Sequence, residues 1–219
     1  IPGDTEKSPA MERRCEFSSR QFTGATGRPV LSPDTSGIIV DLIGSAEHSI
    51  EIEQAYITNE TPLTLNPYLA AAIDAARRGV RVRVLLDSYW YNTRDAADND
   101  EMVAIINAIG KNEQIPLEAR CADLSATGLE KIHNKGVIVD GQSVLVSSIN
   151  WNSNSPNFNR EAGVIIEHPG VAGYFSEVFY DDWSHAVKSP GEETDYVKIT
   201  FITIVIALLG VLYYRRHVR

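Results

Sequence analysis

The succession of apolar and polar positions predicts helices that alternate with strands in the first half of the chain, and consecutive strands after it. Apolar residues at helical spacing predict helices over 32–49, 66–79, 99–110 and 171–187. Short alternating or apolar runs predict strands over 49–57, 80–87, 115–122, 132–140, 143–150 and 161–167. This order predicts an α/β fold with a mixed β-sheet flanked by helices.

Residue types at the boundaries agree with this spacing. Thr35 or Ser36 is expected to cap the first helix, and Asn66, which a proline follows, is expected to cap the second. Gly79 lies just past the end of that second helix, and Gly110 is expected to end the third.

The C-terminal part of the chain differs from the rest because it is almost free of polar residues. Only two threonines and one glycine interrupt the apolar run 199–212, and 196–214 reaches the lower part of the range of about 17–25 residues that a membrane span needs. A basic tail, 215–219, follows. We therefore expect a single-pass membrane protein with 1–195 extracytoplasmic and the tail cytoplasmic. A cytoplasmic tail-anchored arrangement and a buried helix are the alternatives.

The remaining segments complete the expected organisation. Residues 1–30 are polar and broken by glycines, which predicts a linker or the fringe of an upstream domain. A globular domain is expected over 31–187 and a short linker over 188–195. The chain begins with Ile rather than Met, which indicates a piece of a longer or processed protein.

Composition restricts the functional classes only partly. The content of 43% hydrophobic and 22% charged residues is typical of a globular protein and excludes wholesale disorder. A net charge of −9 argues against a broad nucleic-acid-binding surface, though not against a local basic site. Cys15 and Cys121 are compatible with one disulfide or with two separate thiols.

Polar side chains at regular offsets interrupt two of the predicted strands. Residues two apart on a strand share a face, so His133 and Lys135 project together, and so do Ser148 and Asn150. A hairpin turn at 140–142 is expected to bring the two pairs to one surface of the sheet.

This group of side chains suits phosphodiester chemistry. Lys135 and Asn150 are able to bind the non-bridging oxygens of a phosphate diester. A neutral His133 imidazole is able to attack phosphorus, and Glu161, which heads the next strand, is placed to hold its ring and raise its nucleophilicity. This chemistry requires neither a metal nor a cofactor. The alternative interpretation of the same residues is a solvated polar edge of the sheet.

The same residues resemble the signature of the phospholipase D superfamily. The elements His-x-Lys-x4-Asp, Gly-Ser-x-Asn and a glutamate on the following strand are matched by His133, Lys135, Asp140, Ser148, Asn150 and Glu161. One departure is Ser147, which stands where the family commonly has Gly. The likeness runs from Leu31 to Trp183.

The resemblance implies a role for each of these residues. The catalytic set is His133, Lys135, Asp140 and Glu161. The phosphate-binding set is Lys135, Ser148 and Asn150. His133 is implied to act as nucleophile or general acid through a covalent phosphohistidine, with Glu161 orienting it. Asp140 is expected to organise the hairpin more than to take part in the chemistry.

Family members build one active site from two such motifs, whereas this chain has one. The resemblance therefore implies a second half as partner, either from an upstream segment or from a second copy of the chain. The start of the likeness resembles the second half of two-motif members, which favours the upstream segment.

Three functions follow from these observations. The favoured one is a membrane-anchored phosphodiesterase that hydrolyses or transphosphatidylates phospholipids, of phospholipase D or cardiolipin synthase type. The second is a membrane-tethered nuclease, in which Tyr89, Trp90 and Tyr91 would stack on bases. The third is a non-catalytic membrane-anchored binding module. The physiological substrate and the choice between hydrolysis and transfer remain open at this point.

Overall fold

The computed structural model describes residues 16–61, 64–93 and 98–187. Its strands are β1 (Thr26–Ser32), β2 (Ser49–Gln54), β3 (Arg81–Leu86), β4 (Leu117–Cys121), β5 (Lys135–Val139), β6 (Ser143–Ser147) and β7 (Glu161–Glu167). They form one seven-stranded sheet in the order β1-β7-β6-β5-β2-β3-β4. Because β2, β3 and β4 are parallel and the other pairs antiparallel, the predicted mixed sheet is confirmed.

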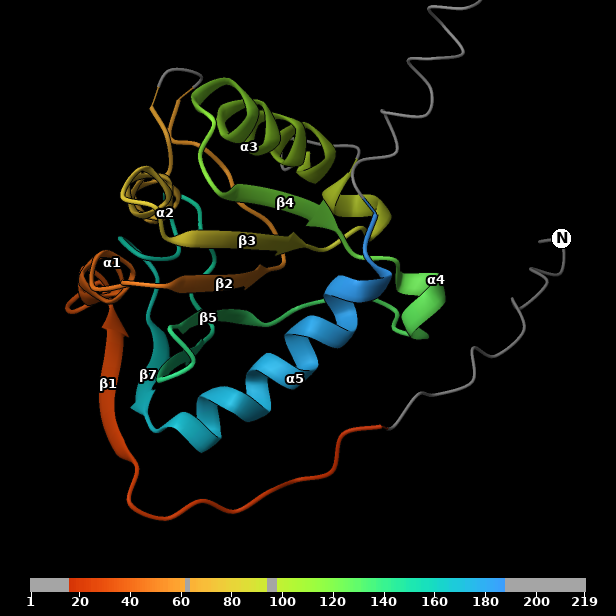
Figure 1. Cartoon of the computed structure of the whole chain (residues 1–219). Coiled ribbons are helices and arrows are strands. Elements are labelled where there is room, and N and C mark those ends of the chain that lie inside the picture. The colour runs from red at the N-terminus through yellow and green to blue at the C-terminus, as the bar shows by residue number, and fades with distance from the viewer. Residues whose placement is uncertain (1–15, 62–63, 94–97, 188–219) are drawn as a thin grey trace, which may run out of the picture.

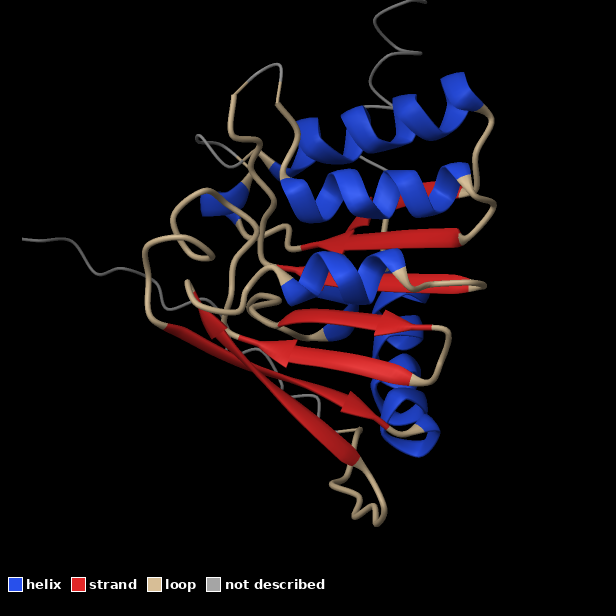
Figure 2. Cartoon of the chain, turned by 90° about the vertical axis from the view of Figure 1, so that its left-hand side faces the viewer, coloured by secondary structure: helices blue, strands red, loops and turns tan. Residues whose placement is uncertain are grey.

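Helices cover both faces of this sheet (Figures 1 and 2). They are α1 (Ile38–Gly44), α2 (Pro67–Arg77), α3 (Asn99–Glu113), α4 (Leu124–Thr127) and α5 (Pro169–His185), with a 3-10 turn, η1 (Trp90–Asn92). Helices α1, α2 and α3 lie on one face and bury the larger hydrophobic core, whereas α5 lies on the other and buries a smaller one. The two cores use alternate residues of the same strands.

Several predicted boundaries are confirmed by hydrogen bonds. The Asn66 side chain accepts from the backbone N–H groups of Tyr68 and Leu69, as an N-cap does. Gly79 follows the end of α2 with a φ of 96°, which glycine adopts without steric cost. The connection 140–142 joins β5 and β6 as an antiparallel hairpin.

Other boundaries differ from the predictions. Neither Thr35 nor Ser36 caps α1, because the Thr35 hydroxyl bonds to Leu31 and the Ser36 hydroxyl to loop carbonyls. Helix α3 continues past Gly110 to Glu113, since Gly110 serves close packing instead: a Cβ there would lie 2.4 Å from the Leu117 carbonyl oxygen.

The sheet also begins earlier than expected. Strand β1 starts at Thr26, inside the stretch 1–30 that was expected to be a linker, and pairs along its whole length with β7. Strand β1 lies at the edge of the sheet and buries only Val30 and Ser32. Its sequence therefore lacks the alternation of apolar and polar residues that predicts a strand.

The expected membrane segment lies outside the described residues, as do the linker before it, the basic tail and Cys15. Among the residues that are described, no helix combines the length and the apolar character needed to cross a bilayer.

Candidate active site

The polar residues of the predicted site meet at one end of the β5–β6 hairpin. His133 lies in the loop before β5, and Lys135 is the first residue of that strand. Ser148 and Asn150 follow the end of β6, whose last residue, Ser147, pairs in register with Lys135. The ladder therefore stops at Lys135 and Ser147 and does not extend over the longer strands predicted. The structure nevertheless brings the two polar pairs to one place.

Lys135 is the buried cation of this group. It is 3% exposed and alternates with Val137 and Val139, which belong to the core under α1–α3, so its side chain lies on that face of the sheet. The ammonium donates a 2.5 Å hydrogen bond to the His133 carbonyl oxygen. Burial, with the like charge of Lys131, lowers the pKa of Lys135 to about 8. The group remains charged at neutral pH, in a place where a charge is costly.

The His133 side chain is exposed, so a substrate is able to reach it. Partial desolvation, followed by the charges of Lys135 and Lys131, lowers the pKa of His133 below its ordinary value. The imidazole is therefore mostly neutral at pH 7. This is the form that attacks phosphorus.

Glu161 binds the loop after β6. One carboxylate oxygen accepts from the Ser148 hydroxyl at 2.5 Å, and the other accepts from Ser155 at 3.1 Å and from Asn159 at 3.3 Å. The Ser148 bond is the main reason that the pKa of Glu161 is lowered. Within the described residues, no hydrogen bond joins this carboxylate to His133. The hydrogen bonds of Glu161 therefore order the loop after β6 and, contrary to expectation, do not hold the imidazole.

Asp87 is a carboxylate that the sequence analysis missed. It follows β3, is fully buried, and accepts a 2.8 Å hydrogen bond from the backbone N–H of Ile132, next to His133. Its other oxygen accepts from the Asn92 amide at 2.8 Å. The charge of Asp87 raises the pKa of His133, but desolvation and the charges of the two lysines lower it by more. Its position at the carboxyl end of a parallel strand, where functional groups of α/β sheets gather, was the available signal.

Asp140 does not belong to the active-site group. It lies at the opposite end of β5 from His133, and its carboxylate accepts from the backbone N–H groups of Glu47, His48 and Ser49 at 2.7–2.9 Å. Although burial opposes it, these donors lower the pKa of Asp140. The resemblance implied that Asp140 belongs to the catalytic set, and its position corrects this expectation. Asp140 anchors the hairpin to the start of β2, which agrees with the organising role expected of it.

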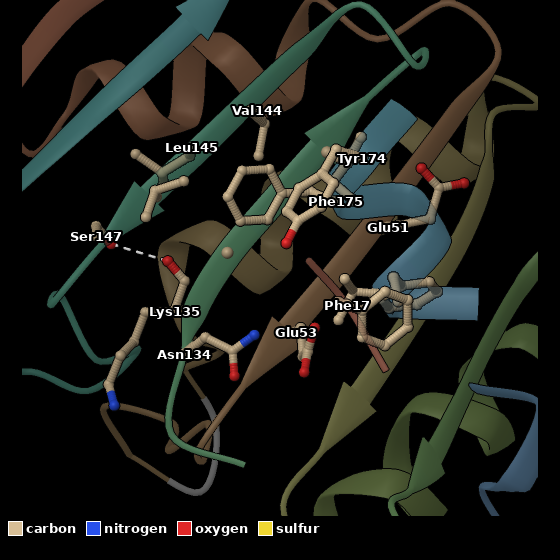
Figure 3. A pocket seen from close by; sticks show the side chains of 15 residues that line it. Phe17, Glu51, Glu53, Asn134, Lys135, Val144, Leu145, Ser147, Tyr174 and Phe175 are labelled. Atoms are coloured by element: carbon tan, nitrogen blue, oxygen red, sulfur yellow. Dashed lines mark hydrogen bonds between the residues drawn. The ribbon is translucent and has the colours of Figure 1, made fainter. Parts of the chain in front are cut away.

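Ser147, the departure from the family pattern, is accommodated by the neighbouring strand. Gly163 faces it in register on β7, and a Cβ on Gly163 would lie 2.6 Å from the Ser147 Cβ. The Ser147 hydroxyl donates to the Lys135 carbonyl oxygen at 3.0 Å (Figure 3). The extra side chain thus holds the start of β5 in place.

Two side-chain amides at this end of the sheet have polar atoms without a partner among the described residues. Asn150 is held by a 2.9 Å bond from its backbone N–H to the Ser155 hydroxyl, while its own Oδ1 is buried and unpaired. Gln54 pairs in register with Lys135, is fully buried, and leaves both amide atoms unpaired. Groups of this kind favour a polar ligand.

Comparison with known proteins identifies the fold. A family model described as "Cardiolipin synthase, PLD-like domain" matches residues 39–183. The chain belongs to this phospholipase D-like family. Membership agrees with the seven-stranded mixed sheet flanked by helices.

Individual relatives are distant. The chain is 24% identical over 152 residues to a mitochondrial cardiolipin hydrolase of Chlamydomonas reinhardtii, a match that covers 69% of this chain and 59% of that protein. It is 27% identical over 180 residues to a mitochondrial cardiolipin hydrolase of Mus musculus, covering 79% and 71%. The phospholipase D family member Nuc from Salmonella typhimurium superposes with a TM-score of 0.58 at 23% identity, over 74% of this chain and 97% of Nuc.

Proposed function

We propose that this phospholipase D-like chain is a phosphodiesterase whose favoured substrate is a phospholipid. The His133 imidazole attacks phosphorus, the alcohol leaves with a proton from a general acid, and a phosphohistidine remains. Water or a second alcohol then attacks the phosphohistidine, which completes hydrolysis or transfer and returns the imidazole.

The buried Lys135 ammonium is the observation that carries this proposal. Among the described residues it forms no ion pair, and it donates to a neutral carbonyl oxygen, that of His133. A buried unpaired cation is costly, and an anionic phosphate beside His133 would offset that cost. Asn150 and Ser148 supply neutral hydrogen-bonding groups at the same place, which suits a singly charged diester.

A chain with one motif has no second imidazole to donate a proton to the leaving-group oxygen. Among the described residues, His168 caps α5 and His48 lies beside Asp140, at the far end of β5 from His133. The proposed enzyme therefore requires a second half, either an upstream segment or another copy of the chain.

The preference for phospholipid rests on two supports. Both curated relatives are named cardiolipin hydrolases. The apolar run 199–212 would anchor the domain next to lipid, in the single-pass arrangement expected above.

The test measures diester turnover by the full chain in nonionic detergent, with cardiolipin, phosphatidylcholine, an aryl phosphodiester and single-stranded DNA as substrates. The variant His133→Ala is expected to lose turnover, whereas His185→Ala, a matched change at an exposed histidine on α5, is expected to keep it. Equal turnover by the His133→Ala protein would refute the proposed nucleophile.

Mixing the two proteins tests the second half. If two copies form one site, adding an equal amount of His133→Ala chain halves the activity of the wild type, because half of its copies then pair with an inactive partner. An unchanged activity shows that the wild-type chain is active without exchanging its partner for the variant. Inactivity of the wild-type protein when it is assayed alone indicates that an upstream half is missing.

A nuclease is the second candidate because of two exposed rings. Trp90 and Tyr91 in η1 are 56% and 59% exposed, and Lys131 lies 5.8 Å from the Tyr89 ring. Exposed rings beside a cation are able to stack on single-stranded bases. Turnover of the DNA substrate that Trp90→Ala reduces, with unchanged turnover of the aryl diester, would support this candidate.

A further inference from the structure

A cavity of about 310 Å³ lies on the face of the sheet that α5 covers, between this helix and strands β2, β5 and β6. Aromatic side chains form much of its wall, namely Phe17, Tyr174, Phe175 and Phe179. Phe17 is 41% exposed, so the cavity opens to solvent beside this ring. Lys135 and Ser147 also line the cavity at the end of the β5–β6 hairpin, but the Lys135 side chain points away from it (Figure 3).

Two buried carboxylates line this mostly apolar cavity. Glu51 and Glu53 occupy alternate positions of β2, are 3% and 7% exposed, and both line the cavity (Figure 3). Glu51 accepts a 2.7 Å hydrogen bond from the Tyr180 hydroxyl. Glu53 has the Asn134 amide as its hydrogen-bond partner, and faces Asp182 of α5 as a like charge. Burial and then Asp182 raise the pKa of Glu53 to about 7.

The neighbouring cations are engaged elsewhere. Arg83 donates to the Tyr180 hydroxyl at 3.0 Å and lies over the rings of Tyr180 and Trp183. Arg20 lies over the Tyr174 ring and pairs with Glu177 at 2.6 Å. Among the described residues, no ion pair is formed by Glu51 or Glu53. The cavity therefore carries negative charge that the fold itself does not neutralise.

These features select the chemistry of a ligand. Buried carboxylates favour a cation, and aromatic rings attract cations through their faces. Aliphatic and aromatic walls do not provide the six or more oxygen ligands that a hard divalent ion prefers. An anion, such as a fatty acid carboxylate or a phosphate, would be repelled by both glutamates.

We propose that this cavity binds an organic ammonium ion that carries an alkyl chain. The ammonium group lies against Glu51 and Glu53, and the chain fills the space between α5 and the β5–β6 hairpin. The proposal does not depend on the phosphodiesterase function, because the carboxylates that bind the ammonium group, Glu51 and Glu53, have no role in the proposed reaction, although Lys135 and Ser147 also border the cavity.

Binding is coupled to the ionisation of Glu53. The ligand prefers the carboxylate form, so its affinity rises as pH rises through the pKa of about 7. From pH 6 to pH 8 the ionised fraction of such a group increases about tenfold. Asp182 and the Asn134 amide act directly on Glu53, and the other titratable groups that line the cavity are Glu51, Lys135 and Tyr174. Arg83 donates to the Tyr180 hydroxyl, which in turn donates to Glu51.

The test is isothermal titration calorimetry of the full chain in nonionic detergent, with hexyltrimethylammonium, hexanol and hexanoate as probes. The ammonium is expected to bind about tenfold more tightly at pH 8 than at pH 6, and more tightly than hexanol, while hexanoate does not bind. Equal affinity for the ammonium and for hexanol would overturn the proposal, since it would indicate an apolar cavity only. Absence of ammonium binding would overturn it as well.

Two variants test whether the ammonium ion binds in this cavity. Glu53→Gln keeps the shape of the side chain and is expected to remove the pH dependence, whereas Glu101→Gln, at an exposed position in the first turn of α3, leaves it unchanged. Val178→Trp fills the cavity from α5 and leaves both carboxylates, so binding is expected to be lost. Circular dichroism confirms that each variant is folded. Full affinity in the folded Val178→Trp protein would contradict the assignment.

Free alkylamines and the headgroups of choline or ethanolamine phospholipids share this chemistry. Competition by phosphocholine or phosphoethanolamine against hexyltrimethylammonium assigns the site to a headgroup. Binding that neither compound displaces assigns it to a free alkylamine. Either result supports the ammonium site.

Discussion

Replacement of Lys135 by methionine is expected to abolish turnover and at the same time to stabilise the fold. The substitution removes the proposed phosphate-binding cation, and it replaces a buried charge with an apolar chain of similar length. Sites that carry function commonly cost stability in this way. The two effects have opposite signs, so the prediction separates a functional lysine from a structural one.

The magnitude follows from the burial of the ammonium. The pKa of Lys135 is about 8 instead of the ordinary 10.5, which corresponds to a cost of about 3 kcal/mol while the group is charged. Methionine loses the hydrogen bond to the His133 carbonyl oxygen, worth about 1 kcal/mol. The net expectation is a gain of about 2 kcal/mol in the free energy of unfolding at pH 7.

The pH dependence has a defined sign. Because the pKa is lower in the folded state, the unfolded chain binds more protons between pH 8 and pH 10.5, and the wild type gains stability across this window. The advantage of Lys135→Met therefore shrinks as pH rises.

Urea unfolding at pH 7 and pH 10, followed by circular dichroism in one nonionic detergent, measures both effects. Lys111→Met, at an exposed position in the last turn of α3, is the control and is expected to change stability by less than about 0.5 kcal/mol. A Lys135→Met protein no more stable than the wild type at pH 7 would refute the reasoning, and so would a gain of equal size at pH 10.

Three further predictions concern the same region. Wild-type turnover is expected to fall about tenfold from its plateau to pH 9 as Lys135, with a pKa of about 8, loses its charge, and a pH–rate profile of Lys135→Arg should lack this fall. Asp140→Asn weakens the acceptor of three backbone N–H groups and is expected to cost about 1–3 kcal/mol in urea unfolding with little change in kcat; a large loss of kcat in the folded variant would restore a catalytic role. Gly163→Ala is expected to cost about 1–3 kcal/mol because its Cβ would lie 2.6 Å from the Ser147 Cβ, and adding Ser147→Gly should recover part of this stability.

Much of the fold was predictable because its signals are local. Asn66 as helix cap, Gly79 after the helix, and the turn at 140–142 each act on residues within a few positions in sequence. The edge strand β1 was missed because its pairing with β7 depends on residues far along the chain. Gly110 was misjudged because the contact that requires a glycine is made with Leu117 of β4, a different element, and the helical pattern of α3 does not contain that contact.

The sequence by itself determined which residue types stand next to each other: His133 two residues before Lys135, and Ser148 two before Asn150. Only the tertiary structure decided that Lys135 is buried, that Glu161 binds Ser148 rather than His133, and that Glu51 and Glu53 line a cavity under α5. Burial, the partner of a carboxylate and the pKa of a side chain depend on groups that other elements bring into contact, and the spacing of residues along one strand does not contain that information.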